Sequence, residues 1–171
     1  MLNNTVELYP YDPDWQLRFK KEKEIITRTL DPSPLPMEHI GSTSIPGMVA
    51  KPIIDILLGV DDLTDFSRLI PSLSRAGYEY IPKPELKTRR FFRKGAPGRG
   101  ICHLHLCEWN GEEWNEKVFF RDYLRLNPEE ASEYTALKKQ LAKDYKHQRS
   151  LYTEMKGPFI LSIIKKSREK G

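Results

Sequence analysis

The polar residues with the clearest chemical potential lie between His39 and Asp55, in the stretch HIGSTSIPGMVAKPIID. A predicted strand over residues 37–41 ends in a glycine, and three hydroxyl-bearing residues then form a tight turn. Glycine lets the backbone approach a ligand closely, and turn amides together with hydroxyls bind anions. Lys51 precedes the next predicted strand and could reach the same anion. The pattern predicts a phosphate site made of Gly41, Ser42, Thr43, Ser44 and Lys51.

Asp55 is the one charged residue in the apolar run over residues 53–60. A run of this kind is typical of a strand buried on both faces of a sheet. A carboxylate in such a strand is costly unless it is paired or bound to a metal. The alternative is that Asp55 accepts hydrogen bonds from neighbouring backbone amides. In the strand before it, Glu38 and His39 point to opposite sides, and we favour His39 as the one that lines the pocket.

A second feature is the basic segment from Lys83 to Arg99, which carries seven cations and one acid in a chain whose formal net charge is +4. This segment therefore supplies the whole surplus of positive charge. It can be interpreted as a solvated hairpin or as a surface for a phosphate-bearing partner. Phe91 and Phe92 lie among the cations, which favours the second interpretation, with Arg90 and Arg93 as further phosphate-binding candidates.

The elements that would position these residues are short strands followed by helices. Hydrophobic periodicity predicts strands over residues 5–9, 37–41, 53–60, 77–81, 88–94 and 101–107. It predicts helices from residue 12 or 14 to residue 30 and from 62 to 76, the second with a kink near Pro71. From residue 112 onward the pattern is helical, with breaks at 127–128 and 157–158. The order indicates an α+β fold with an all-helical C-terminal half.

Composition excludes several classes of protein. The chain has 171 residues, which suits a single domain over 1–171, and 39% of them are hydrophobic, which is typical of a globular protein. Cys102 and Cys107 are too few for a secreted disulfide framework and are expected to be small buried residues. No apolar run approaches the roughly 20 residues of a membrane span, and the N-terminus lacks the pattern of a signal peptide. We expect a cytoplasmic protein without a membrane partner.

The stretch from His39 to Asp55 also resembles the GrpB family signature, H-I-G-S-T-S-[VI]-P-G-x-x-A-K-P-I-I-D, at every fixed position. The resemblance covers nearly the whole chain, through Leu104-His105-Leu106, residues 120–125, Tyr134 with Lys138, and Tyr152 with Lys156. The family is similar to the nucleotidyltransferase superfamily, which implies a mixed sheet flanked by helices. In that fold Gly41 and Ser42 would bind nucleotide phosphates and Asp55 a divalent ion.

One departure from the superfamily pattern concerns the metal. Active members carry two acids at alternate positions of the strand, and here the second position is Leu57. If 102–107 is the later strand that should carry a third acid, His103 and His105 replace it. Asp55, His103 and His105 would then suit Mn²⁺ or Zn²⁺ better than Mg²⁺. The alternative is that both histidines are ordinary hydrogen-bonded strand residues.

Three functions compete on this sequence. One is metal-assisted nucleotidyl or phosphoryl transfer, with Asp55 and His105 as catalytic residues. Another is a non-catalytic module that binds a nucleotide or a coenzyme A-type molecule, because GrpB-like domains occur fused to dephospho-coenzyme A kinases. Nucleic-acid binding ranks last, because the pI of 9.0 depends on one segment and no recognition motif is visible. In the first two cases the partner is a phosphorylated small molecule.

Overall fold

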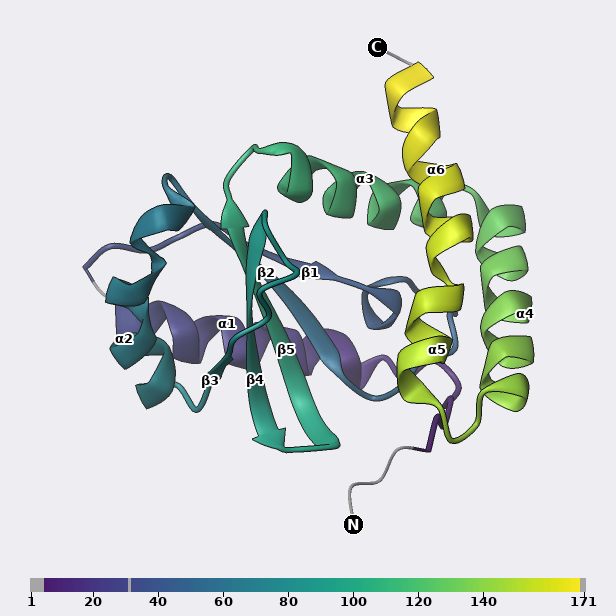
Figure 1. The fold of residues 1–171 in the computed structure, drawn as a ribbon, viewed down its shortest axis with the longest axis horizontal. Helices are drawn as coiled ribbons and strands as arrows, with labels where there is room; N and C mark the ends of the chain where they lie inside the picture. Colours follow the sequence, from purple (N-terminus) through teal and green to yellow (C-terminus); the bar gives the residue numbers. More distant parts are fainter. Residues whose placement is uncertain (1–4, 31, 170–171) are drawn as a thin grey trace.

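A computed structural model describes residues 5–30 and 32–169 of the chain. Its strands are β1 (Met37–Ile40), β2 (Ile54–Val60), β3 (Glu79–Ile81), β4 (Arg89–Ala96) and β5 (Arg99–Glu108). They form one sheet in the order β1-β2-β5-β4-β3, shown in Figure 1. Strands β2 and β5 are parallel, whereas each other neighbouring pair is antiparallel. The predicted α+β class and mixed sheet are confirmed.

Strand β2 lies inside the sheet, between β1 and β5, and its sequence is apolar on both faces. Every residue of this strand is buried except Asp55, which is half-buried. Its parallel neighbour β5 is the middle strand of the sheet, and Leu104 and Leu106 of β5 are fully buried. Two adjacent buried strands thus carry the polar residues of interest into the middle of the sheet.

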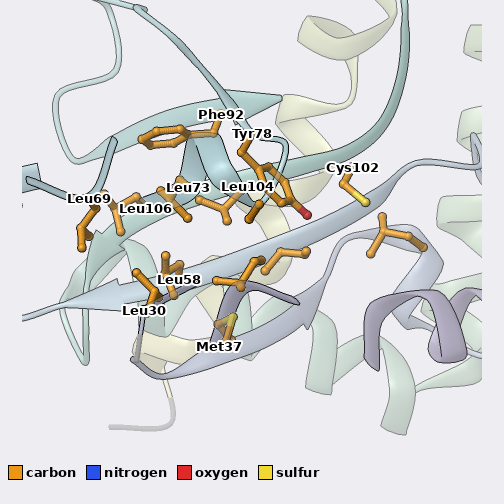
Figure 2. Close-up of a cluster of buried hydrophobic side chains, with 14 of the residues drawn as sticks. Leu30, Met37, Leu58, Leu69, Leu73, Tyr78, Phe92, Cys102, Leu104 and Leu106 are labelled. Carbon is orange, nitrogen blue, oxygen red and sulfur yellow. The ribbon is translucent and has the colours of Figure 1, made fainter. Parts of the chain in front are cut away.

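One face of the sheet is covered by α1 (Asp14–Leu30) and α2 (Ile70–Arg75). Apolar side chains of both helices pack there against alternate residues of the strands, as Figure 2 shows for Leu58, Leu73, Phe92, Leu104 and Leu106. This is the main hydrophobic core of the molecule. The core determines which residues of each strand point toward α1 and α2. The residues between them must then point to the other face of the sheet.

The other face is only partly covered. Helix α3 (Glu112–Leu126) places Trp114 against Leu57 and Cys107. Helices α4 (Pro128–Asp144), α5 (Arg149–Met155) and α6 (Gly157–Glu169) pack together on one side of the molecule (Figure 1). The all-helical C-terminal half is therefore confirmed, and none of the helices in the described residues has the length and apolarity that crossing a membrane requires.

Two sequence-based expectations differ from the structure. Residues 5–9 do not form a strand of the sheet: Tyr9 makes an isolated bridge with Ala50, and the Val6 amide donates to the Lys146 carbonyl. The expected helix over 62–76 is divided into the 3₁₀ helix η2 (Leu63–Leu69) and α2. Proline is well tolerated only in the first turn of a helix, which is where Pro71 lies in α2.

Candidate functional site

Parallel pairing of β2 with β5 brings together the three residues predicted to act as a unit. Asp55 is opposite His103 in the register, and Leu57 is opposite His105. All these side chains share the sheet face that α1 and α2 leave free. Asp55 Oδ1 lies 3.2 Å from His105 Nε2 and 3.7 Å from His103 Nδ1. The carboxylate is thus the centre of a compact polar group on the open face.

The turn after β1 packs directly against this carboxylate. Gly41 has a φ of 73°, and a Cβ placed there would lie 2.5 Å from Asp55 Oδ2. Only glycine fits a positive φ together with so close an approach. The next residues form the 3₁₀ helix η1 (Ser42–Ser44). The predicted turn and the predicted carboxylate are therefore one site.

The three hydroxyls of η1 have different partners. Thr43 Oγ1 lies 2.9 Å from His39 Nε2, and Ser44 Oγ donates to the Gly41 carbonyl at 2.5 Å. Both residues are buried, whereas Ser42 is half-buried. Ser42 is thus the most exposed of the three hydroxyl-bearing residues of this turn.

A buried lysine from α4 holds the Ser42 hydroxyl in place. Lys138 Nζ donates to Ser42 Oγ at 2.8 Å and to the Val49 carbonyl, and the residue is 1% exposed. Its ammonium lies 4.8 Å from the centre of the Tyr134 ring. Burial, with added repulsion from Lys156 and Lys51, lowers the pKa of Lys138 to about 7.

Two more lysines lie over a single tyrosine ring. Lys51 Nζ is 5.4 Å and Lys156 Nζ is 4.7 Å from the centre of the Tyr152 ring. Burial and the charges of Lys156 and Arg149 lower the pKa of Lys51 to about 8. Burial also lowers the pKa of Lys156, while Asp55 acts to raise it. We call Lys51, Lys138 and Lys156 the lysine cluster.

Within the described residues, no carboxylate forms an ion pair with any member of the lysine cluster or with Arg149. Asp55 is the acid whose charge acts on Lys51 and Lys156. Burial acts to raise the pKa of Asp55, but the His105 hydrogen bond and nearby positive charge hold it at about 2. Burial lowers the pKa of His103 to about 4. At neutral pH Asp55 is ionised, His103 is uncharged, and the site has a surplus of positive charge.

The chain is similar over most of its length to the proteins of one family. The model of the GrpB family, described as GrpB protein, matches residues 5–166. This chain belongs to the GrpB family. It is 35% identical over 163 residues to the glutamate-rich protein GrpB of Alkalihalophilus pseudofirmus, which covers 93% of this chain and 94% of that protein. The crystal structure of GrpB from Enterococcus faecalis matches with a TM-score of 0.85 and 38% identity, over 96% of this chain and 98% of that one.

Two more distant similarities were found. The Cid1 poly(U) polymerase structure matches with a TM-score of 0.56 and 12% identity, over 80% of this chain and 43% of that one, which shows a nucleotidyltransferase-like fold. A dephospho-CoA kinase of Mycolicibacterium paratuberculosis is 23% identical over 188 residues, which cover 95% of this chain and 46% of the kinase.

Several residues predicted for the site lie elsewhere in this GrpB protein. Arg90 is paired with Leu106 and so points to the α1 and α2 face, where its guanidinium lies 5.0 Å from the Phe66 ring. The prediction that Arg90 joins the phosphate site is wrong on this geometry. Arg93 shares the site face, opposite His103, but its guanidinium donates to Glu79 at 2.8 Å.

The expectation that His39 lines the pocket is also wrong. Its register partner is Ile56, which points to the main core, and its ring stacks on Phe19 at 4.8 Å. Glu38 takes the site face instead and accepts a hydrogen bond from the buried Arg121 of α3 at 2.5 Å. The prediction for Cys102 and Cys107 is confirmed, because both are free thiols and buried.

Sequence analysis did not assign Lys138, Lys156 or Arg149 to the site. A signal was present: a tyrosine stands four residues before a lysine at 134 and 138 and again at 152 and 156. On a helix this spacing places the two side chains on the same face. Both tyrosines are buried, so each lysine is directed inward over an aromatic ring.

Asp55, His103 and His105 do not fit the divalent metal ion that a nucleotidyltransferase-like fold suggests. Among the described residues, no group of three or more histidine, cysteine, aspartate or glutamate side chains is arranged so that it could hold a metal ion. The second carboxylate position is the fully buried Leu57. Asp55 also lies within the field of three ammonium groups, which would repel a divalent cation. These are Lys51, Lys117 and Lys156.

Proposed function

We propose that this GrpB protein binds a phosphorylated small molecule, such as a nucleotide or a coenzyme A-type compound, against Ser42 and the lysine cluster. The observation that carries the proposal is the convergence of three lysines on the open sheet face with no carboxylate paired to them in the described residues. Lys138 is buried and Lys51 and Lys156 are half-buried, and like charges held together with so little water are expensive unless something of opposite sign joins them. A phosphate group supplies that charge and several acceptor oxygens.

The position of Ser42 supports the same class of ligand. An ammonium group can only donate hydrogen bonds, so a charged Lys138 makes Ser42 Oγ the acceptor of that bond. The hydroxyl of Tyr134 also hydrogen-bonds with Ser42, so a ligand oxygen that accepts the Ser42 proton would take the place of Tyr134. A donor held beside ammonium groups is suited to an anion and unsuited to a cation.

The dephospho-CoA kinase comparison gives independent support for the ligand class. A segment similar to nearly this whole chain occurs in a protein named for a coenzyme A precursor. A coenzyme A-type compound carries several phosphates, which matches a site with a surplus of cations. We therefore include such compounds beside nucleotides in the tests.

Phosphoryl or nucleotidyl transfer is the second candidate, favoured by the Asp55–His105 pair. General bases work best when their pKa lies near the working pH. The pKa of Asp55 is held at about 2, which makes it a weak base, and burial lowers the pKa of His105 as well. Binding thus fits the electrostatics better than catalysis by Asp55 and His105.

Isothermal titration calorimetry of ATP, coenzyme A and dephospho-coenzyme A tests the proposed function. We expect at least one of them to bind, and Lys51→Ala to weaken its binding by roughly 1.5–3 kcal/mol through loss of a charged hydrogen bond. Lys139→Ala is the matched control, because Lys139 follows Lys138 on α4 but is exposed. Equal loss in both variants, or no binding of any of the three compounds, would overturn the proposal.

A further inference from the structure

The charge balance of the site suggests how it would hold phosphates. Lys51 and Lys156 share the Tyr152 ring, and Lys138 donates to Ser42. The charges of Lys156 and Arg149 lower the pKa of Lys51, and those of Lys156 and Lys51 lower the pKa of Lys138. Asp55 is the acid that partly offsets the charges of Lys51 and Lys156. The site therefore has a formal surplus of positive charge before any ligand enters.

In transferases that use divalent ions, the ions neutralise the charge of the phosphates and are held by protein carboxylates. The corresponding strand here offers Asp55 and then Leu57, while β5 offers two histidines. The positive charges of Lys51, Lys117 and Lys156 act on Asp55, the carboxylate that would have to hold a dication. The protein thus has the cations but lacks the carboxylates.

We propose that the lysine cluster takes the place of metal ions, so that this site binds a polyphosphate group in the absence of any divalent metal. The inference rests on the proposed function and adds the ligand's charge class and its independence of metal. A ligand with two or more phosphates fits best, because a single phosphate would leave part of the surplus charge unbalanced. Lysine ammonium groups act as point charges toward phosphate oxygens and need no fixed coordination geometry.

Contacts within the fold hold the lysine cluster and Arg149 in place. Lys138 comes from α4 and lies over the buried ring of Tyr134, whereas Lys156 caps the C-terminal end of α5 and lies over the buried ring of Tyr152. Arg149 of α5 donates to the Gly98 carbonyl at 3.4 Å, which joins the helices to the hairpin between β4 and β5. The cations are therefore held on elements that pack against the sheet, and they do not require a ligand to bring them together.

The test is calorimetric titration of pyrophosphate and of ATP in EDTA and, separately, with excess Mg²⁺, Mn²⁺ or Zn²⁺. We expect binding in EDTA, and equal or weaker binding with metal, because a metal bound to the phosphates reduces their negative charge. In EDTA, Lys156→Gln should weaken binding about tenfold or more, while Lys139→Gln should leave it unchanged. Lys51→Gln provides a second variant if Lys156→Gln does not fold.

The outcomes separate this inference from the proposed function. Binding that is at least about tenfold tighter with a divalent ion than in EDTA would overturn metal independence and leave the proposed function standing. Equal binding by wild type and by both lysine variants in EDTA would overturn the role of the cluster. Failure of every compound to bind under all conditions would overturn both proposals.

Discussion

At the scale of single residues, the contact between Gly41 and Asp55 determines whether the site can form. No side chain beyond hydrogen fits between the turn and the carboxylate, because a Cβ would lie 2.5 Å from Asp55 Oδ2. The φ of 73° adds backbone strain for any other residue. The glycine therefore sets the distance between the Ser42 hydroxyl and Asp55.

We expect Gly41→Ala to lower the free energy of unfolding by roughly 1–3 kcal/mol and to weaken polyphosphate binding. Urea denaturation and calorimetry measure the two effects. Gly157→Ala is the control: a Cβ there has open space, and the change should stay within about 0.5 kcal/mol. If Gly41→Ala were as stable as Gly157→Ala, the close packing of turn and carboxylate would be wrong.

Lys138 also gives a residue-scale prediction on stability and pH. Its pKa is about 7 in the folded protein and ordinarily 10.5, so between these values the unfolded chain binds the extra proton. Stability should therefore rise with pH from about 7, at up to roughly 1.4 kcal/mol per pH unit from this group. The groups that face it and share this field are Lys51, Lys156 and the Tyr134 ring.

Urea denaturation at about pH 7 and about pH 7.8 checks this slope, below the ordinary thiol pKa of about 8.5. Lys138→Met should reduce the rise by roughly 1 kcal/mol per pH unit, whatever it does to the stability itself. Lys139→Met should keep the wild-type slope. A slope that Lys138→Met leaves unchanged would show that Lys138 is charged throughout this range.

At the scale of elements, the sheet could be predicted from the sequence because its strands follow simple patterns of apolar and polar residues. The apolar run of β2 predicted a central strand, and alternation in β5 placed His103 and His105 on one face. The sequence alone did not show which residues of β1 face the core, because this depends on the antiparallel register of β1 with β2. That register pairs Ile40 with Asp55 and so turns His39 to the core.

The lysines that the C-terminal helices bring to the site could not be predicted from the sequence, and the reason is a different one. Lys138 lies 96 residues from Ser42 in the sequence, and their contact depends on how α4 packs against the turn. That packing uses Ile45 and Met48 after η1, which share a buried cluster with Tyr134. Periodicity indicates that a helix has a buried face, but it does not identify the surface that the face will cover.

An element-scale prediction concerns Leu57, the place where a second carboxylate is missing. Leu57 is fully buried against Ile40, Cys107 and Trp114, so Leu57→Asp should destabilise the protein by roughly 3 kcal/mol or more. If ammonium groups already fill the role of metal, the variant should gain no more than about threefold in Mg²⁺ affinity. Calorimetric titration with Mg²⁺ and thermal unfolding measure the two effects. A large gain in Mg²⁺ binding would indicate that the strand retains the geometry of a metal site.

At the scale of the whole molecule, the site lies where the two halves of the chain meet. Strand β2 provides Asp55, the segment between β1 and β2 provides Ser42 and Lys51, and the C-terminal helices provide Lys138 and Lys156. Binding an anion between them should therefore stabilise the whole fold by mass action. Thermal unfolding with and without pyrophosphate should show a rise in Tm for wild type and a smaller rise for Lys156→Gln.

The most direct test of the central claim is proton uptake when ATP binds at about pH 8, measured by calorimetry in two buffers of different ionisation enthalpy. The lysine cluster includes groups with pKa values of about 7 and about 8, so part of it is uncharged before binding. An anion raises these pKa values, and we expect uptake of roughly one proton per ATP, reduced in Lys138→Met. Binding with no uptake, or with proton release, would contradict the account, because the phosphates would then lie away from the lysine cluster.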